Sequence, residues 1–126
     1  MPLLRDDFVV VFATAPPNSS GRLARLIVEE GLAACINISQ VRSTFFWEGE
    51  VKEEAEDLLI IKTMTEKLEL LATRIREVHP YDLPEVIALQ VVGGDDDYLA
   101  WISEALRGTV RPEEQFCRRV GCLRPS

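Results

Sequence analysis

The sequence predicts an α+β fold in which two helices cover one face of an antiparallel sheet. Strand-like and helical segments alternate in the order β-α-β-β-α-β, and both helical segments are apolar on one side only. A Glu-Gly pair also joins two long strand-like runs, as in a hairpin. At 126 residues, 47% hydrophobic and 28% charged, the chain has the size and composition of one globular domain.

The first elements are a buried strand and an amphipathic helix. Residues 8–14 are apolar and rich in β-formers, and the prolines that follow end the strand. Ser19 or Ser20 is suited to cap the helix, because a serine oxygen accepts hydrogen bonds from free backbone N–H groups. Gly31 stands where the helix would stop in a left-handed conformation.

The middle of the chain predicts a long β-hairpin. Residues 33–47 form one strand, with a bulge at residues 39–40, and residues 51–63 form the returning strand. Glu48-Gly49 is the turn, since glycine supplies the positive φ that tight turns need. Such a hairpin is long for a small sheet, and its exposed edge favours oligomerisation.

The second half repeats the pattern of helix and strand. Thr65 precedes an amphipathic helix that ends near Val78, and the turn HPYDLP follows at residues 79–84. Residues 86–92 predict the last strand, and acidic residues 95–97 favour the start of an extra C-terminal helix. The order is that of a ferredoxin-like split βαβ fold with an added helix.

Six segments, in order and in register from about residue 8 to residue 107, resemble the CutA family of divalent-cation tolerance proteins. They are TAP at 14–16, EEGLAACINI at 29–38, FFWEGEV at 45–51, LLIIKT at 58–63, HPYDLPEVIAL at 79–89 and DYLAWI at 97–102. The resemblance implies a ferredoxin-like protomer in a compact homotrimer, whose long hairpin strands pair between subunits, similar to PII-type signalling proteins. It implies a role in copper and divalent-cation tolerance, and it brings no settled enzymatic reaction.

The resemblance also directs attention to metal ligands. Copper-binding members of the family can carry a cysteine before Thr-Ala-Pro and a second histidine before His-Pro-Tyr, where this chain has Ala13 and Val78. The candidate copper or divalent-cation ligands are therefore His79, the only histidine, and Cys35. The alternative is structural: His79 ends a helix, and Cys35 is a small buried hydrophobe.

A second candidate site is a cleft of large aromatic and charged side chains. Such a cleft would hold a small molecule, and the alternative is that the same residues pack a trimer interface. Its expected members are Trp47, Lys62, Tyr81, Asp82, Glu85, Tyr98 and Trp101. Six further carboxylates in residues 48–57 are interpreted as a solvated hairpin tip rather than a site for hard cations.

The charge distribution excludes several function classes. The net charge is −7, although the tail after residue 106 carries five arginines against two glutamates. An acidic body repels nucleic acid and anionic membranes, so neither is an expected partner. We expect residues 1–107 to form the domain and residues 108–126 a partly disordered basic tail in which Cys117 and Cys122 have no assigned role. The odd cysteine count and the lack of a signal-like start predict a cytoplasmic protein.

Three functional hypotheses follow. The first is a non-enzymatic trimer for metal tolerance, with copper as the candidate metal. The second is a PII-like sensor that holds a small anionic or nucleotide ligand between subunits and signals to an unidentified protein partner. The third is an enzyme in which His79 acts as acid–base beside Asp82 or Glu85. It is ranked last, because the only histidine of the chain is the single possible base for a nucleophile.

Overall fold

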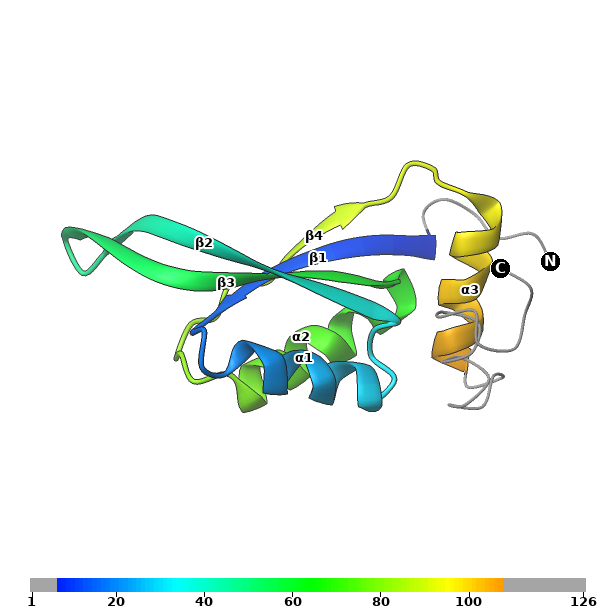
Figure 1. The fold of residues 1–126 in the computed structure, drawn as a ribbon, viewed down its shortest axis with the longest axis horizontal. Coiled ribbons are helices and arrows are strands. Elements are labelled where there is room, and N and C mark those ends of the chain that lie inside the picture. Colours follow the sequence, from blue (N-terminus) through cyan, green and yellow to red (C-terminus); the bar gives the residue numbers. More distant parts are fainter. Residues whose placement is uncertain (1–6, 108–126) are drawn as a thin grey trace.

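A computed structural model describes residues 7–107, and these residues form the predicted α+β domain (Figure 1). The four strands lie in the order β2-β3-β1-β4, and every neighbouring pair is antiparallel. The elements are β1 (Phe8–Ala15), α1 (Ser20–Glu29), β2 (Cys35–Trp47), β3 (Glu50–Met64), the 3-10 turn η2 (Thr65–Lys67), α2 (Leu68–Val78), β4 (Ile87–Gln90) and α3 (Asp96–Arg107). The expected tail at residues 108–126 lies outside the described residues.

The β2–β3 hairpin is continuous from Cys35 opposite Lys62 to Trp47 opposite Glu50. The bulge expected at residues 39–40 is therefore wrong, because both residues pair regularly with β3. A bulge would insert an unpaired residue and turn every later side chain of β2 to the other face of the sheet. The turn is confirmed, with φ of 52° at Glu48 and 80° at Gly49.

The outer half of the hairpin projects beyond the rest of the sheet (Figure 1). Pairing of β3 with β1 ends at Ala15 opposite Asp57, so residues 50–56 pair with β2 alone. We call this two-stranded extension, residues 41–56, the hairpin arm. It supplies one wall of the site described below.

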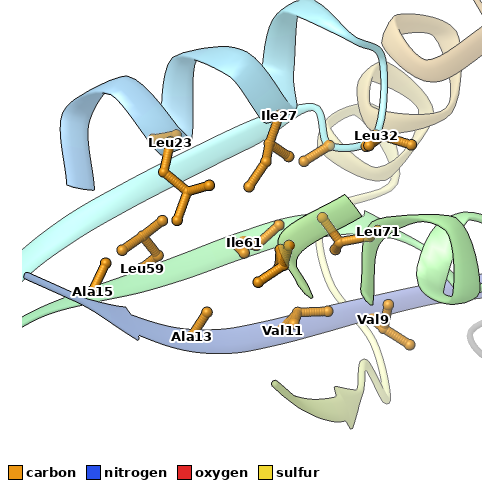
Figure 2. Packing of buried hydrophobic residues seen from close by; sticks show 13 residues of the cluster. Val9, Val11, Ala13, Ala15, Leu23, Ile27, Leu32, Leu59, Ile61 and Leu71 are labelled. Atoms are coloured by element: carbon orange, nitrogen blue, oxygen red, sulfur yellow. The ribbon is translucent and has the colours of Figure 1, made fainter. Parts of the chain in front are cut away.

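The main core lies between the sheet and helices α1 and α2. In Figure 2, Leu23 and Ile27 of α1 point toward Leu59 and Ile61 of β3. Leu71 approaches from α2, and all five side chains are buried. The positive φ of 75° at Gly31 confirms the predicted left-handed stop after α1.

Apart from the end that α3 covers, the opposite face of the sheet carries no helix of the described residues (Figure 1). On that face β4 leaves Ile87 and Leu89 53% and 47% exposed. β4 is shorter than the expected 86–92 and pairs only with residues 9–12 of β1. We call this surface the open face. A second apolar cluster, at the end of the sheet away from the arm, holds α3 through Phe8, Met64, Ile102 and Leu106.

Candidate functional site

The HPYDLP loop is fixed to the sheet by its histidine. His79 stands at the C-terminal end of α2, as predicted, and is 8% exposed. Its Nδ1 accepts a hydrogen bond from the Tyr81 backbone N–H at 3.0 Å. The other nitrogen, Nε2, therefore carries the hydrogen and donates to the Thr14 carbonyl oxygen at 2.6 Å. A metal ion at either nitrogen would have to replace one of these hydrogen bonds.

Tyr81 links the HPYDLP loop to the hairpin arm. Its hydroxyl donates a hydrogen bond to Oε2 of Glu56 at 3.1 Å, and its ring lies 4.8 Å from that of His79. Burial raises the pKa of Tyr81 to about 12, aided by the hydrogen bond to Glu56 and by the negative charges of Glu56 and Glu54. The phenol therefore keeps its proton and remains a donor throughout the physiological range.

The arm and the loop enclose a pocket of about 700 Å³. We call it the arm pocket. The arm contributes aromatic, hydroxyl and charged side chains, and the loop contributes the opposite wall. The lining residues are Thr14, Ser43, Thr44, Phe45, Trp47, Lys52, Glu54, Glu56, Pro80, Tyr81, Asp82, Leu83 and Glu85. Partial burial raises the pKa of Glu85, and the negative charge of Glu56 raises it further.

Four of the seven residues expected in the ligand cleft come together here, and three do not. Trp47, Tyr81, Asp82 and Glu85 line the arm pocket. The other three lie elsewhere in the protomer. Lys62 lies beside Cys35, with Nζ 4.0 Å from Sγ, and Tyr98 and Trp101 stack on α3 with ring centres 5.6 Å apart.

The two expected metal ligands are separated within one protomer. Cys35 lies across the sheet from Val10 of β1, whereas His79 is bonded to Thr14, four residues further along the same strand. Four residues of strand span about 13 Å, far more than one ion can bridge. Within residues 7–107 there is also no group of three or more His, Cys, Asp or Glu side chains that could hold a metal ion.

Sequence reasoning missed the acidic side chains of the arm as part of a site. The run at residues 48–57 was interpreted as a solvated tip, yet Glu56 and Asp57 at its inner end are 6% and 7% exposed. Asp57 also accepts a hydrogen bond from the hydroxyl of Ser20 at the start of α1. The alternation of side chains along a strand could have indicated this site. It places Glu54 and Glu56 on one face of β3, the same face of the hairpin as Trp47 of β2.

The sheet order, with two helices on one face and a long hairpin, defines a ferredoxin-like domain of the PII-like class. A family described as CutA1 divalent ion tolerance protein matches residues 9–105, and the chain belongs to this family. It is 46% identical over 101 residues to the chloroplastic CutA protein of Arabidopsis thaliana, covering 79% of this chain and 56% of that protein. It is 41% identical to the divalent-cation tolerance protein CutA of Pectobacterium atrosepticum, covering 80% of this chain and 94% of the relative.

Solved structures show the same architecture. The PII-like protein CutA of Nostoc sp. PCC 7120, in its apo form, superposes with a TM-score of 0.75 at 37% identity. The match covers 78% of this chain and 96% of that one. The chain thus spans little more than half the length of its plant relative but nearly all of this cyanobacterial structure. Among the described residues, no helix has both the length and the apolar character needed to span a membrane.

Proposed function

We propose that this chain works as a homotrimer in divalent-cation tolerance, and that each subunit holds a small ligand in the arm pocket as a PII-like sensor. The observation that carries the proposal is the pocket of about 700 Å³, whose loop wall is tied to β1 by His79. Pockets of this size, with apolar walls and a few placed polar groups, are typical of small-molecule sites. The proposal assigns no chemical reaction, and an unidentified protein partner would read the ligand state.

The open face supports the trimer. Ile87 and Leu89 are apolar and about half exposed there, and exposed apolar surface on a sheet favours association. Light scattering should give three times the subunit mass. Leu89→Asp should dissociate the assembly, whereas Leu70→Asp should not, because Leu70 is 60% exposed on α2, away from the open face. A monomer at micromolar concentration would contradict the trimer.

The role of the pocket can be tested in a bacterial strain that lacks its own family member. Expression of this chain should restore growth at raised copper concentration, and Trp47→Ala, which opens the pocket wall, should not. Phe46→Ala is the matched control, since the adjacent Phe46 is 71% exposed and does not line the pocket. Equal growth with both variants would show that copper tolerance does not depend on the arm pocket.

Copper binding at Cys35 is the second candidate function. Its thiol is free and only partly buried at the edge of the open face, where neighbouring subunits would have to supply further ligands. A free thiol also supports a cytoplasmic location. Calorimetric titration of metal-stripped protein with Cu²⁺, Cu⁺ and Zn²⁺ tests this. Tight binding at a fixed ratio, lost in Cys35→Ser or His79→Ala, would support a metal site, and unchanged weak binding would contradict it.

A further inference from the structure

Within one subunit, the described residues that line the arm pocket carry more carboxylates than positive charges. Glu54 and Glu56 come from β3 and Asp82 and Glu85 from the loop, against Lys52 as the one ammonium group among the lining residues. Lys52 itself lies 4.0 Å from a carboxylate outside the pocket, that of Glu50.

Glu56 is the buried member of this set. It is 6% exposed and accepts the Tyr81 hydroxyl, and within residues 7–107 no cation pairs with it. A buried carboxylate that has a hydroxyl partner but no counter-ion is costly to desolvate. A cation that enters the pocket would remove this cost.

The negative charges are spread out rather than focused on one point. The described residues contain no cluster of three or more ligands able to hold a metal ion, so the pocket does not form a compact ion cage. Glu54 and Glu56 lie two residues apart on the same face of β3, so their Cα atoms are about 7 Å apart. This spacing suits a ligand whose cationic groups are separated by a short chain.

The pocket walls suit such a chain. Phe45 and Trp47 of β2 and Tyr81 of the loop present aromatic surface beside the carboxylates. Aromatic faces cover methylene groups and also attract ammonium groups through their negative ring faces. The geometry points to a linear di- or polyamine as the ligand of the arm pocket, with its ammonium groups on Glu54, Glu56 and Glu85 and its methylenes against Trp47 and Tyr81.

This inference rests on the proposed function, because it names the ligand class of the same pocket. It also disfavours the anionic or nucleotide ligand expected from the sequence. A phosphate would face four carboxylates, and Lys62, the expected anion partner, lies beside Cys35 and does not line the pocket. Glu56 lies close enough to both groups that its charge adds to the effect of burial in raising the pKa of Tyr81 and of Glu85.

The test is calorimetric titration of the full chain with spermidine in a low-salt buffer. We expect saturable binding of one spermidine per subunit. In Glu56→Gln the affinity should fall about tenfold or more, because the buried charge is removed while an acceptor for Tyr81 remains. Glu54→Gln provides a second, exposed change that does not depend on a buried residue. Glu66→Gln is the matched control, since Glu66 is exposed on η2 and does not line the pocket.

Each outcome decides the inference. Fluorescence of Trp47, followed in a Trp101→Phe background, should change on binding and locate the ligand in the pocket. Absent binding, or equal affinity in Glu56→Gln, Glu54→Gln and Glu66→Gln, would overturn the inference. So would equal competition by Mg²⁺ at the same ionic strength, which would indicate charge screening alone. Pocket binding of a nucleotide without spermidine binding would overturn the polyamine but leave the proposed sensor intact.

Discussion

His79 and Thr14 are joined by a hydrogen bond that spans 65 residues of sequence, from the imidazole Nε2 to the backbone carbonyl oxygen at 2.6 Å. The same ring accepts the backbone N–H of Tyr81. One buried side chain thus links β1, the end of α2 and the loop wall of the arm pocket. All unfolding experiments compare variants at one subunit concentration, because the proposed assembly would contribute to apparent stability.

His79→Ala should lower the free energy of unfolding by about 2–4 kcal/mol, because it removes two partly buried hydrogen bonds and leaves a cavity. Denaturant unfolding measures the change. Asp82→Ala, in the same loop but exposed, should stay within about 0.5 kcal/mol of wild type. Similar losses in the two variants would show that the histidine does not hold the loop.

The Tyr81 hydroxyl should make stability depend on alkaline pH. Its folded-state pKa of about 12 lies above the ordinary value of 10, so its contribution is complete below pH 10 and is lost as pH rises through about 12. The difference in unfolding free energy between wild type and Tyr81→Phe should shrink over that window. In Glu56→Gln, phenolate absorbance should show Tyr81 titrating at lower pH. An unchanged titration would contradict the contact.

Ser20 and Asp57 should behave as a coupled pair. Ser20→Ala leaves the buried Asp57 carboxylate without its hydroxyl donor, and Oδ1 already has no partner in the described structure. The expected loss is about 1–3 kcal/mol of unfolding free energy. Ser20→Ala combined with Asp57→Ala should cost less than the sum of the single changes, as a double-mutant cycle would show. Strict additivity would rule out the coupling.

The hairpin turn offers a stabilising change. Glu48 has a φ of 52°, a conformation that glutamate adopts with strain and asparagine tolerates well. Glu48→Asn should therefore raise the free energy of unfolding by up to about 1 kcal/mol. Gly49→Ala should lower the free energy of unfolding by about 1 kcal/mol, because alanine is strained at a φ of 80°. A steric clash does not contribute, since an added Cβ would meet no atom within 4 Å. Thermal or denaturant unfolding distinguishes the two directions.

Local rules predicted the order of the strands and helices and the turn at residues 48–49, but not the helix caps. The N-cap residues of α1 and α2 are Ser19 and Lys67, and neither makes a side-chain cap hydrogen bond. Gly31 and Gly49 have the positive φ expected of them, and α2 ends at His79. These features depend on neighbours in sequence, so single residues reveal them. The predicted bulge was wrong because the polar pair Ser39-Gln40 looks like an interruption, whereas both residues simply sit in an exposed part of the ladder.

The site was only partly predictable because it forms by long-range contact. Tyr81 and Asp82 were expected in a cleft, but their partner Glu56 lies 25 residues before the tyrosine in an acidic run typical of solvent-exposed surface. In the folded chain Glu56 is buried and accepts the hydroxyl of Tyr81 from the loop. Lys62 was expected to supply the positive group of the same cleft, and strand register places it beside Cys35 instead.

The edge position of β2 has a consequence for the lone subunit. Strand β2 is 13 residues long and pairs with β3 on one side only, so the other side carries a long row of unpaired backbone groups among the described elements. Such a row is a template for runaway strand addition and aggregation. In the proposed trimer, newly made chains would have to find each other quickly. Variants that weaken association should then be lost from cells as insoluble deposits rather than persist as functional monomers.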